Sequence, residues 1–310
     1  MTRKNITRRE LLQASVALGC LAAAPISVSA IETGGTDAGR SSGVANPLKP
    51  PAEGSIPVAF LISEGAVVID FCGPWEVFQD VMLPGQMDMA FKLFTVSEKT
   101  NPIQVSGGMK ITPDYRLENA PTAKVVVIPA QSDPSEAVLA WVRKSAKTAD
   151  VVMSVCTGAY LLARTGLLAG KEATTHHGSY VDFARKYPDI HVKRGARFVE
   201  DGNLASAGGL SSGIDLALRV VERYYGRELA EQAAYDMEYQ GEGWMSPDSN
   251  AVYAQMRTSM NGRPLCVVCS MVVDAATAAK SVYQGKAYYF CSANHKSIFD
   301  ASPADFKSSI

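Results

Sequence analysis

The stretch Val151-Val-Met-Ser-Val-Cys156-Thr-Gly-Ala159 joins an apolar run to a helical one. Its first five residues predict a buried strand, and the residues that follow predict a helix that stops at Gly166. Cys156 therefore stands on a sharp strand-to-helix turn, where its sulfur can point outward. A helix N-terminus stabilises a thiolate, so we expect a reactive thiol here. A buried structural cysteine is the alternative.

Strand and helix patterns alternate around this turn. Strands are predicted at residues 58–62, 91–96 and 125–128, and helices at residues 73–82, 135–146 and 212–226. The first helix would hold Pro74 in its opening turn, and the last would begin at a capping box, Ser212-Gly-Ile-Asp215. This order predicts an α/β fold, a three-layer α/β/α sandwich around a mainly parallel, flavodoxin-like sheet. Sites in such sheets lie at the carboxyl ends of strands, where Cys156 falls.

The chain has 310 residues, more than one ordinary domain needs. We expect residues 56–240 to form the main domain, 241–262 a linker, and 263–310 a small α+β metal-binding module. Residues 31–55 are dominated by glycine, serine, proline and alanine, and we expect a disordered tether there. A unit of about fifty residues needs a cross-link, such as a bound metal ion or a disulfide, to be stable.

Residues 1–30 have the pattern of a twin-arginine signal peptide. Thr7-Arg-Arg-Glu-Leu-Leu12 holds the arginine pair, an apolar stretch runs to Ala24, and Val28-Ser-Ala30 has the small residues of a signal-peptide cleavage site. The apolar stretch is too short for a membrane span. A lipid-attachment box at Ala17-Leu-Gly-Cys20 fits poorly, because leucine precedes the glycine. We therefore expect a periplasmic protein without a membrane span.

Charge argues against nucleic acid as a partner. Residues 1–30 hold four of the 30 basic and one of the 31 acidic side chains, which leaves 26 against 30, a net charge of −4. No basic stripe suits nucleic acid or an anionic membrane surface. Five cysteines follow Ala30, and an odd number spread along the chain argues against a disulfide framework.

A cysteine nucleophile needs a partner that manages its proton. Asp70 follows the apolar run Ala66-Val-Val-Ile69 and precedes Phe71-Cys-Gly-Pro74, where an irregular segment enters a helix. It is the candidate partner of Cys156, and an ordinary acid at a helix N-terminus is the alternative. Cys72 is a candidate for the core, for the pocket wall or for a disulfide with Cys156.

Five segments together resemble the ThiJ/PfpI superfamily (the DJ-one/PfpI group), which is related to class I glutamine amidotransferases. They are Asp70-Phe-Cys-Gly-Pro-Trp-Glu-Val-Phe78, Ser154-Val-Cys-Thr-Gly158, Gly166-Leu-Leu-Ala-Gly170, Ala173-Thr-Thr-His176 and Gly208-Gly-Leu-Ser-Ser-Gly-Ile-Asp215. The Asp-x-x-Gly-Pro and Cys-Thr-Gly forms look most like the isonitrile hydratase branch. They also occur in the sensor-like halves of certain transcription regulators.

The resemblance implies roles for individual residues. Cys156 would be the nucleophile, Asp70 its acid/base partner and Thr157 a neighbouring polar group. The backbone N–H groups of Thr157 and Ala130 would stabilise developing negative charge. The implied reaction converts a small-molecule isonitrile to an N-substituted formamide, with no cofactor or metal at Cys156. Relatives are often dimers, so a homodimer is one expected arrangement.

The resemblance also places Gly73 and His176 in the pocket, and the chain departs from the family at three points. Gln131 stands where a second glycine is common and would narrow the pocket. Thr157 replaces the histidine of protease-like relatives, which argues against peptidase activity. His177 replaces an aromatic residue, and a packing role is the alternative for both histidines.

Cys266-x2-Cys269 and, after 21 residues, Cys291-x3-His295 have the spacing of a structural metal site. Cys291 and His295 would share one face of a helix. Gln284-Gly285 predicts a hairpin turn, and Tyr288-Tyr-Phe290 predicts a strand that leads into that helix.

This region resembles the YHS domain in Cys266-Val-Val-Cys-Ser-Met271, Val273-Asp274, Tyr283-Gln-Gly285, Tyr288-Tyr-Phe-Cys291, Phe299 and Pro303. His295 stands where that family usually has a fourth cysteine. An imidazole with three thiolates suits zinc, and the nearby Met271 would also suit Cu(I).

Two functions from different classes remain open. The first is an exported, cysteine-dependent hydro-lyase of the isonitrile hydratase type, with a tethered metal module; the complete Asp-Cys-Thr set favours it. The second is a non-enzymatic redox sensor or metal-handling protein, which the metal module favours. Glyoxalase or deglycase activity is disfavoured, because those branches of the superfamily pair the cysteine with glutamate. No helix-turn-helix segment follows the main domain, which disfavours direct transcriptional regulation.

Overall fold

A computed structural model describes residues 45–84, 89–255 and 257–306 of the chain. The predicted signal peptide and most of the predicted tether lie outside these ranges. Within them, no helix combines the length and the apolar character that a membrane span needs.

A seven-stranded sheet forms the centre of the main domain, in the order β10-β11-β7-β6-β1-β2-β5. Its strands are β1 (Ile56–Leu61), β2 (Phe91–Ser97), β5 (Tyr115–Arg116), β6 (Val125–Ile128), β7 (Val151–Val155), β10 (Phe198–Asp201) and β11 (Leu204–Ala207). All pairings are parallel except the one between β10 and β11. The prediction of a mainly parallel sheet is confirmed.

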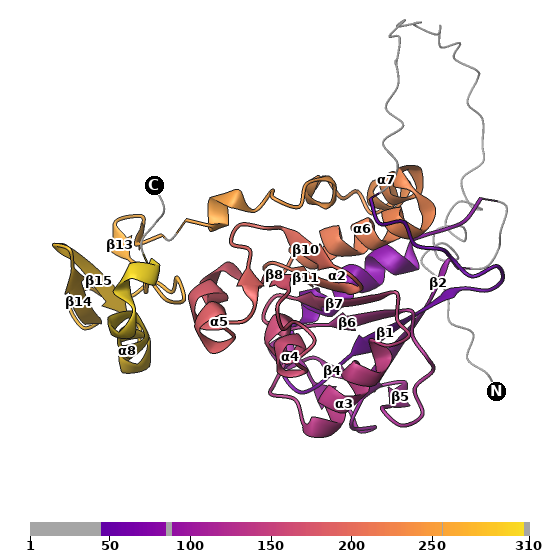
Figure 1. The fold of residues 1–310 in the computed structure, drawn as a ribbon, viewed down its shortest axis with the longest axis horizontal. Helices are drawn as coiled ribbons and strands as arrows, with labels where there is room; N and C mark the ends of the chain where they lie inside the picture. Colours follow the sequence, from indigo (N-terminus) through magenta and orange to yellow (C-terminus); the bar gives the residue numbers. More distant parts are fainter. Residues whose placement is uncertain (1–44, 85–88, 256, 307–310) are drawn as a thin grey trace, which may run out of the picture. The chain divides into compact units, whose positions relative to one another are not determined.

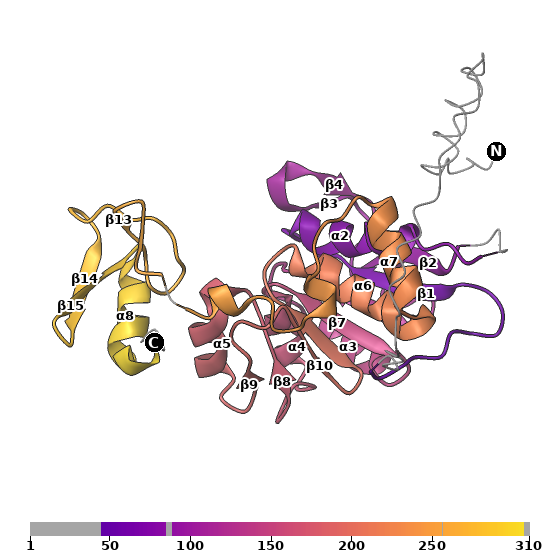
Figure 2. The same ribbon diagram turned by 90° about the horizontal axis from the view of Figure 1, so that it is seen from above.

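Helices cover both faces of this sheet (Figures 1 and 2). One face carries α2 (Val68–Gln79), α6 (Ser212–Tyr225) and α7 (Arg227–Asp236), and the other carries α3 (Glu136–Ser145), α4 (Gly158–Arg164) and α5 (Tyr180–Lys186). Side chains alternate along each strand, so Val58 and Phe60 of β1 join the first layer while Ala59 and Leu61 join the second. The result is the predicted three-layer sandwich.

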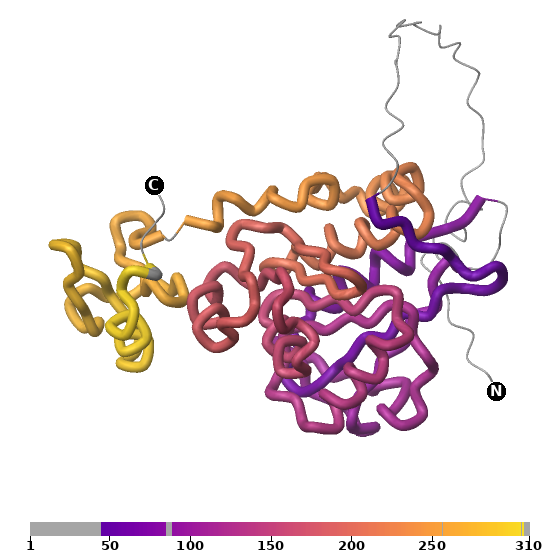
Figure 3. The backbone as a smooth tube through the Cα atoms, viewed as in Figure 1, coloured from indigo at the N-terminus to yellow at the C-terminus, as the bar shows by residue number. Residues whose placement is uncertain are grey.

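The remaining elements are short, and the chain's path through them can be followed as a tube in Figure 3. Paired short strands are β3 (Ile103–Gln104) with β4 (Lys110–Ile111), β8 (Glu172–Ala173) with β9 (His191–Val192), and β12 (Ser259–Met260) with β13 (Arg263–Pro264). The C-terminal region adds a hairpin of β14 (Ala279–Tyr283) and β15 (Lys286–Phe290), then helix α8 (Ala293–Ala301). The 3-10 turns are Ser106–Gly108, His177–Ser179, Gly243–Met245, Ala251–Tyr253 and Pro303–Phe306.

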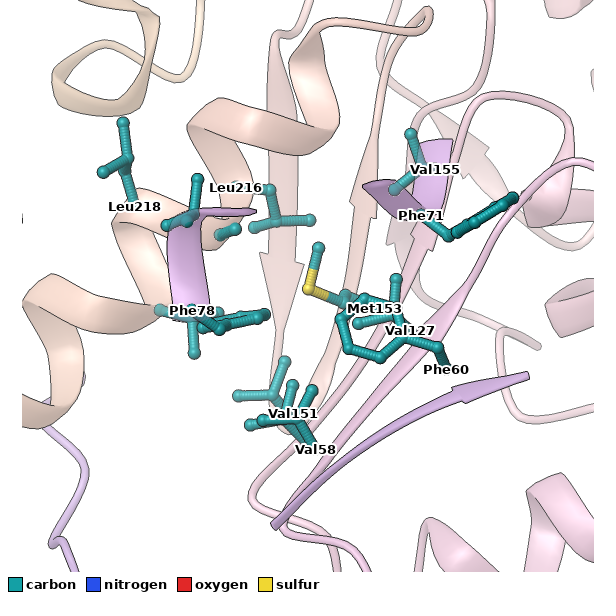
Figure 4. Close-up of a cluster of buried hydrophobic side chains, with 14 of the residues drawn as sticks. Val58, Phe60, Phe71, Phe78, Val127, Val151, Met153, Val155, Leu216 and Leu218 are labelled. Carbon is teal, nitrogen blue, oxygen red and sulfur yellow. The ribbon is translucent and has the colours of Figure 1, made fainter. Parts of the chain in front are cut away.

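A large cluster of apolar side chains fills the core between the sheet and helices α2 and α6 (Figure 4). Met153 and Val155 of β7 face Phe71 of α2 and Leu216 of α6 in this cluster. Full burial of each such side chain stabilises the folded state by about 1.5–3 kcal/mol. This packing fixes β7, and therefore the turn that follows it, in the middle of the sheet.

Helix α2 begins at Val68, five residues before the predicted start, and holds Pro74 in its interior. The prediction that Pro74 lies in the opening turn is wrong. The helix starts earlier because distant acceptors bind the free backbone N–H groups at its beginning. The Val67 N–H donates to the Ala130 carbonyl (2.8 Å), and the Val68 N–H donates to Ser106 Oγ (3.0 Å). The earlier start places Asp70 inside the helix.

The predicted capping box at the start of α6 is also wrong. Ser211 occupies the N-cap position and makes no side-chain cap. Ser212 Oγ instead accepts a hydrogen bond from Asn250 Nδ2 (3.3 Å), and Asp215 pairs with Arg197. The side chains of Ser212 and Asp215, which would form a local cap, therefore bind residues far along the chain.

The packed domain extends beyond residues 56–240 at both ends. Arg219 and Arg223 of α6 donate to the backbone carbonyls of Ala45 and Asn46 (both 2.8 Å), which belong to the predicted tether. In the predicted linker, Trp244 is 3% exposed and Asn250 is 6% exposed. Both segments therefore contribute contacts to the main domain.

Candidate functional site

Cys156 has a left-handed backbone conformation, with φ of 57°, between β7 and α4. This conformation destabilises a residue other than glycine by about 1–2 kcal/mol. Three hydrogen bonds hold it: the Cys156 N–H donates to the carbonyls of Gly208 (2.9 Å) and Ala207 (3.2 Å), and Thr175 Oγ1 donates to the Cys156 carbonyl (2.9 Å). Strain that its surroundings enforce in this way is typical of functional sites.

Close packing at Gly158 completes the turn. A Cβ atom at Gly158 would lie 2.3 Å from the carbonyl oxygen of Ile128 and 2.8 Å from that of Pro129. Only glycine therefore lets α4 start against the end of β6. This contact brings Thr157 to the loop that follows β6.

The Cys156 sulfur is mostly enclosed, since the residue is 8% exposed. Burial and the nearby charge of Asp70 raise the pKa of the thiol to about 11, although N–H groups of Thr157 and Leu210 and the Thr157 side chain oppose this. The prediction of a ready thiolate at the helix N-terminus is wrong, because desolvation outweighs the N–H groups. At neutral pH the sulfur carries its proton.

Asp70 is fully buried beside this thiol. Burial raises its pKa from 3.8 to about 7, and a hydrogen bond from the Ala130 N–H to Oδ2 (3.1 Å) opposes the rise. Its second oxygen, Oδ1, has no hydrogen-bond partner in the part of the chain that the structure describes. A carboxyl with this pKa exchanges protons readily near neutral pH, as a general acid/base must.

The Ala130 N–H is therefore bound to Asp70 and is not free to stabilise substrate charge, contrary to its predicted role. Leu210, which sequence reasoning missed, supplies the second N–H near the sulfur, beside that of Thr157. Its φ of 45° turns the backbone at the end of the Gly208-Gly-Leu segment. The signal for this role was present in the motif, where a bulky residue follows two glycines after β11.

Arg197 holds the loop that carries Leu210. Its backbone carbonyl accepts from the Gly208 N–H (2.9 Å), and its guanidinium donates to Ser211 Oγ (3.1 Å). The same guanidinium pairs with the buried Asp215 (Nε to Oδ2, 2.6 Å) and donates to Asn250 Oδ1 (3.2 Å). Sequence reasoning did not select Arg197, because its partners are far from it along the chain.

The two predicted pocket residues have different positions. His176 packs against the Leu210 loop, where a Cβ on Gly209 would lie 2.7 Å from its ring. Its Nδ1 accepts from the Gly178 N–H (3.2 Å), and burial lowers its pKa, so the neutral ring is favoured. Gly73 packs against helix α6, where a Cβ would meet Ile214 at 2.8 Å, and its role is helix packing.

Cys72 and Cys156 are both free thiols. Burial, with a smaller effect of Glu76, raises the pKa of Cys72. The disulfide considered between these two cysteines is not formed in this structure.

A second cluster lies in the C-terminal region and consists of Cys266, Cys269, Cys291 and His295. Their ligand atoms all lie within 4.8 Å of one another. Cys269 and Cys291 sulfurs are 3.6 Å apart, and His295 Nδ1 lies 3.5 Å from Cys266 Sγ and 3.1 Å from Cys291 Sγ. Zn–S bonds of 2.3 Å and Zn–N bonds of about 2.0 Å in a tetrahedron require separations of roughly 3.5–3.8 Å. The Cys269–Cys291 and Cys266–His295 separations match this range and the Cys291–His295 separation is shorter, so the donor set suits one small tetrahedral ion.

Backbone hydrogen bonds position the ligand residues of this cluster. Cys266 to Met271 form a tight knuckle, closed by hydrogen bonds from Ser270 N–H to the Cys266 carbonyl (2.7 Å) and from Cys266 N–H to the Met271 carbonyl (2.8 Å). Burial disfavours the Cys266 thiolate, but nearby backbone N–H groups outweigh burial and lower its pKa. Cys291 precedes α8 rather than lying on it, and Ser292 caps that helix by accepting from the His295 N–H (3.2 Å).

The fold and the strained cysteine define an α/β protein of the nucleophile-elbow class. The profile of the DJ-1/PfpI family matches residues 57–223, more than half of the chain, and that of the YHS domain matches residues 267–309. The chain belongs to the DJ-1/PfpI family and carries a YHS domain in its C-terminal region. Both resemblances found in the sequence are confirmed.

Similar proteins include enzymes and regulators. Isonitrile hydratase of Pseudomonas putida is 32% identical over 191 residues, which are 60% of this chain and 79% of that enzyme. The HTH-type transcriptional regulator CdhR of Pseudomonas aeruginosa is 29% identical over 148 residues, 46% of this chain and 44% of the regulator. A solved THiJ/PfpI family protein from Pseudomonas syringae is 26% identical with a TM-score of 0.54, covering 67% of this chain and 84% of its own.

Burial of Asp70 makes a testable contribution to stability. Its pKa is raised from 3.8 to about 7, so the unfolded chain loses this proton at lower pH than the folded one, and the folded state is weakened as pH rises from about 4 to 7. We expect Asp70→Asn to stabilise the fold above pH 7 by up to about 4 kcal/mol and to change little near pH 4.5. Urea unfolding at both pH values measures this difference.

Glu231→Gln, at an exposed carboxylate of α7, serves as the matched control and should change the free energy of unfolding little at either pH. Equal effects of Asp70→Asn at pH 4.5 and pH 8 would contradict a buried carboxyl that ionises near pH 7.

Proposed function

We propose that this chain is a hydratase of the isonitrile hydratase type, with Cys156 as nucleophile and Asp70 as acid/base. One observation carries the proposal: a buried carboxyl whose pKa is about 7 lies beside a strained, buried thiol. The 32% identity to isonitrile hydratase across 79% of that enzyme supports the reaction class.

The first half of the reaction forms a carbon–sulfur bond. Asp70 as carboxylate takes the Cys156 proton while the sulfur attacks the terminal carbon of the isonitrile. Asp70 then gives this proton to the same carbon, which yields a thioimidate bound to the enzyme. Transfer from a thiol of pKa about 11 to an acid of pKa about 7 costs about 5 kcal/mol if it precedes attack. We therefore expect proton transfer to accompany bond formation.

The second half consumes water. Asp70 takes a proton from a water molecule as its oxygen attacks the thioimidate carbon, and passes this proton to the nitrogen. The proton left on the new hydroxyl group is the one that returns to the sulfur. The carbon–sulfur bond then breaks, the sulfur recovers a proton, and an N-substituted formamide leaves. The N–H groups of Thr157 and Leu210 stabilise negative charge on the sulfur at both ends of this sequence.

Turnover should depend on Asp70 being ionised. Because its pKa is raised to about 7, kcat/KM for formamide production should rise about tenfold per pH unit below pH 7 and level off above it. Asp70→Asn should lower kcat by about 10²–10⁴, and Cys156→Ala should abolish turnover. The measurement is formamide release from a panel of isonitriles between pH 5 and 9.

Cys72→Ser is the control for a nearby thiol outside the mechanism, and it should retain activity. Turnover that persists in Cys156→Ala, or a flat pH profile in the wild type, would remove this mechanism.

Metal handling by the C-terminal region is the second candidate function, and the four converging ligand atoms favour it. Three thiolates and one imidazole suit zinc as a structural ion, and they also suit Cu(I). A redox-sensing role for Cys156 is less well supported, because oxidation proceeds through the thiolate, which burial disfavours at this position.

The metal site can be tested with zinc as the probe. The full chain, saturated with Zn(II) and dialysed, should retain about one ion per chain by elemental analysis. Cys291→Ser should lose most of it, whereas Cys72→Ser, which leaves all four ligands in place, should retain it. Equal retention by wild type and Cys291→Ser would exclude the four-ligand site.

We also propose export by the twin-arginine pathway, on the strength of Arg8-Arg9 and the small-residue cleavage site at Ala30. In bacterial cells with this translocase, the chain should appear in the periplasmic fraction with residues 1–30 removed. Replacing both Arg8 and Arg9 by lysine should retain it in the cytoplasm, whereas Lys4→Arg should not. Periplasmic accumulation of the double variant would contradict this route.

A further inference from the structure

A cavity of about 170 Å³ lies beside the nucleophile turn, between the loop after β6 and helices α4 and α5. Such a volume holds about five water molecules, or a small ligand of similar size. The residues that matter in its lining are Gln131, Thr157, Tyr160, Arg164, Lys186 and Tyr187.

Thr157 connects this cavity to the candidate active site. It lines the cavity and also offers its backbone N–H and its side chain to the Cys156 sulfur. A molecule that fills the cavity therefore contacts Thr157, which follows Cys156 in the chain.

The outer wall of the cavity is positively charged. Within the described residues, Arg164 forms an ion pair with Asp133 (Nη1 to Oδ1, 3.5 Å), whose side chain is fully exposed, so this pair is weak and exchangeable. The Lys186 ammonium lies 5.7 Å from the centre of the Tyr160 ring. Asp182, which is partly exposed, already accepts hydrogen bonds from the Tyr160 hydroxyl (3.0 Å) and from Arg185 (3.2 Å). A ligand anion would meet two cations, and its competitor in the lining is the exposed carboxylate of Asp133.

The inner wall holds an amide without partners. Gln131 Nε2 and Oε1 are both buried, and neither has a hydrogen bond within the described residues. A buried polar group left unpaired costs about 1–3 kcal/mol. A polar ligand group in the cavity would offset this cost, since the amide can both donate and accept.

We propose that this cavity binds the body of a carboxylate-bearing small molecule, with the carboxylate between Arg164 and Lys186. A planar carboxylate matches the two-pronged guanidinium of Arg164, and a polar group further in would pair with Gln131. This inference rests on the proposed function in one respect, that Cys156 is the nucleophile. It then defines the substrate class as an isonitrile that carries a carboxylate.

The test compares two alkylating reagents that differ in charge. Iodoacetate and iodoacetamide both form a carbon–sulfur bond with the Cys156 thiolate and release iodide, but only iodoacetate is an anion. The ratio of their rates cancels any change in the thiol pKa, because both use the same thiolate. Mass spectrometry of the Cys156 peptide from the full chain gives each rate.

Removing a cavity cation should lower the iodoacetate-to-iodoacetamide ratio. We expect about a threefold loss in Arg164→Gln or Lys186→Gln and about tenfold in the double variant, as for partly exposed charges. Added salt should reduce the wild-type ratio towards that of the double variant. Lys144→Gln, an exposed cation outside the cavity, should leave the ratio unchanged. Arg164 and Lys186 are exposed, so these variants should keep the wild-type melting temperature.

A wild-type ratio equal to that of the double variant would overturn the cavity proposal and leave the hydratase proposal intact. Conversely, the expected ratios with no formamide from neutral or carboxylated isonitriles would support the cavity and remove the hydratase.

Discussion

The strained backbone of Cys156 is the constraint around which the main domain is arranged. A left-handed cysteine is unstable by itself, and it persists because Gly208 and Thr175 bond to both of its peptide groups. Those partners come from the segments after β11 and β8, which the sheet brings to the end of β7. Apolar packing around Met153 and Val155 keeps β7 in place, so the core stabilises the geometry of the turn at Cys156.

Two acidic groups share the enclosed site that this geometry creates. Burial disfavours the charged form of each, and the charge of Asp70 further disfavours the Cys156 thiolate. The pair therefore resists carrying two negative charges at once. A proton that moves between carboxyl and sulfur keeps one charge in the site, which is what addition of a thiol to a neutral, polarised carbon requires. Ala130 tunes this balance through its hydrogen bond to Asp70 rather than by contacting a substrate.

Local patterns predicted the parts of this structure that depend on local physics. The Val151–Val155 strand, the turn at Cys156 and the hairpin at Gln284-Gly285 appear as expected, with both hairpin residues at positive φ. The start of α2 and the role of Ser212 were missed, because Ala130 and Asn250 satisfy their polar groups from far along the chain. The thiol pKa was missed for the same reason, since burial depends on the whole fold.

The two cysteine sites make different demands on the same side chain, and they differ in the groups that surround each sulfur. In the knuckle, backbone N–H groups lower the pKa of Cys266, while burial raises the pKa of Cys269 to about 12. Burial and Asp70 raise the pKa of the Cys156 thiol to about 11. Four ligand atoms converge in the C-terminal cluster. We therefore expect a soft cation to bind the C-terminal cluster rather than Cys156.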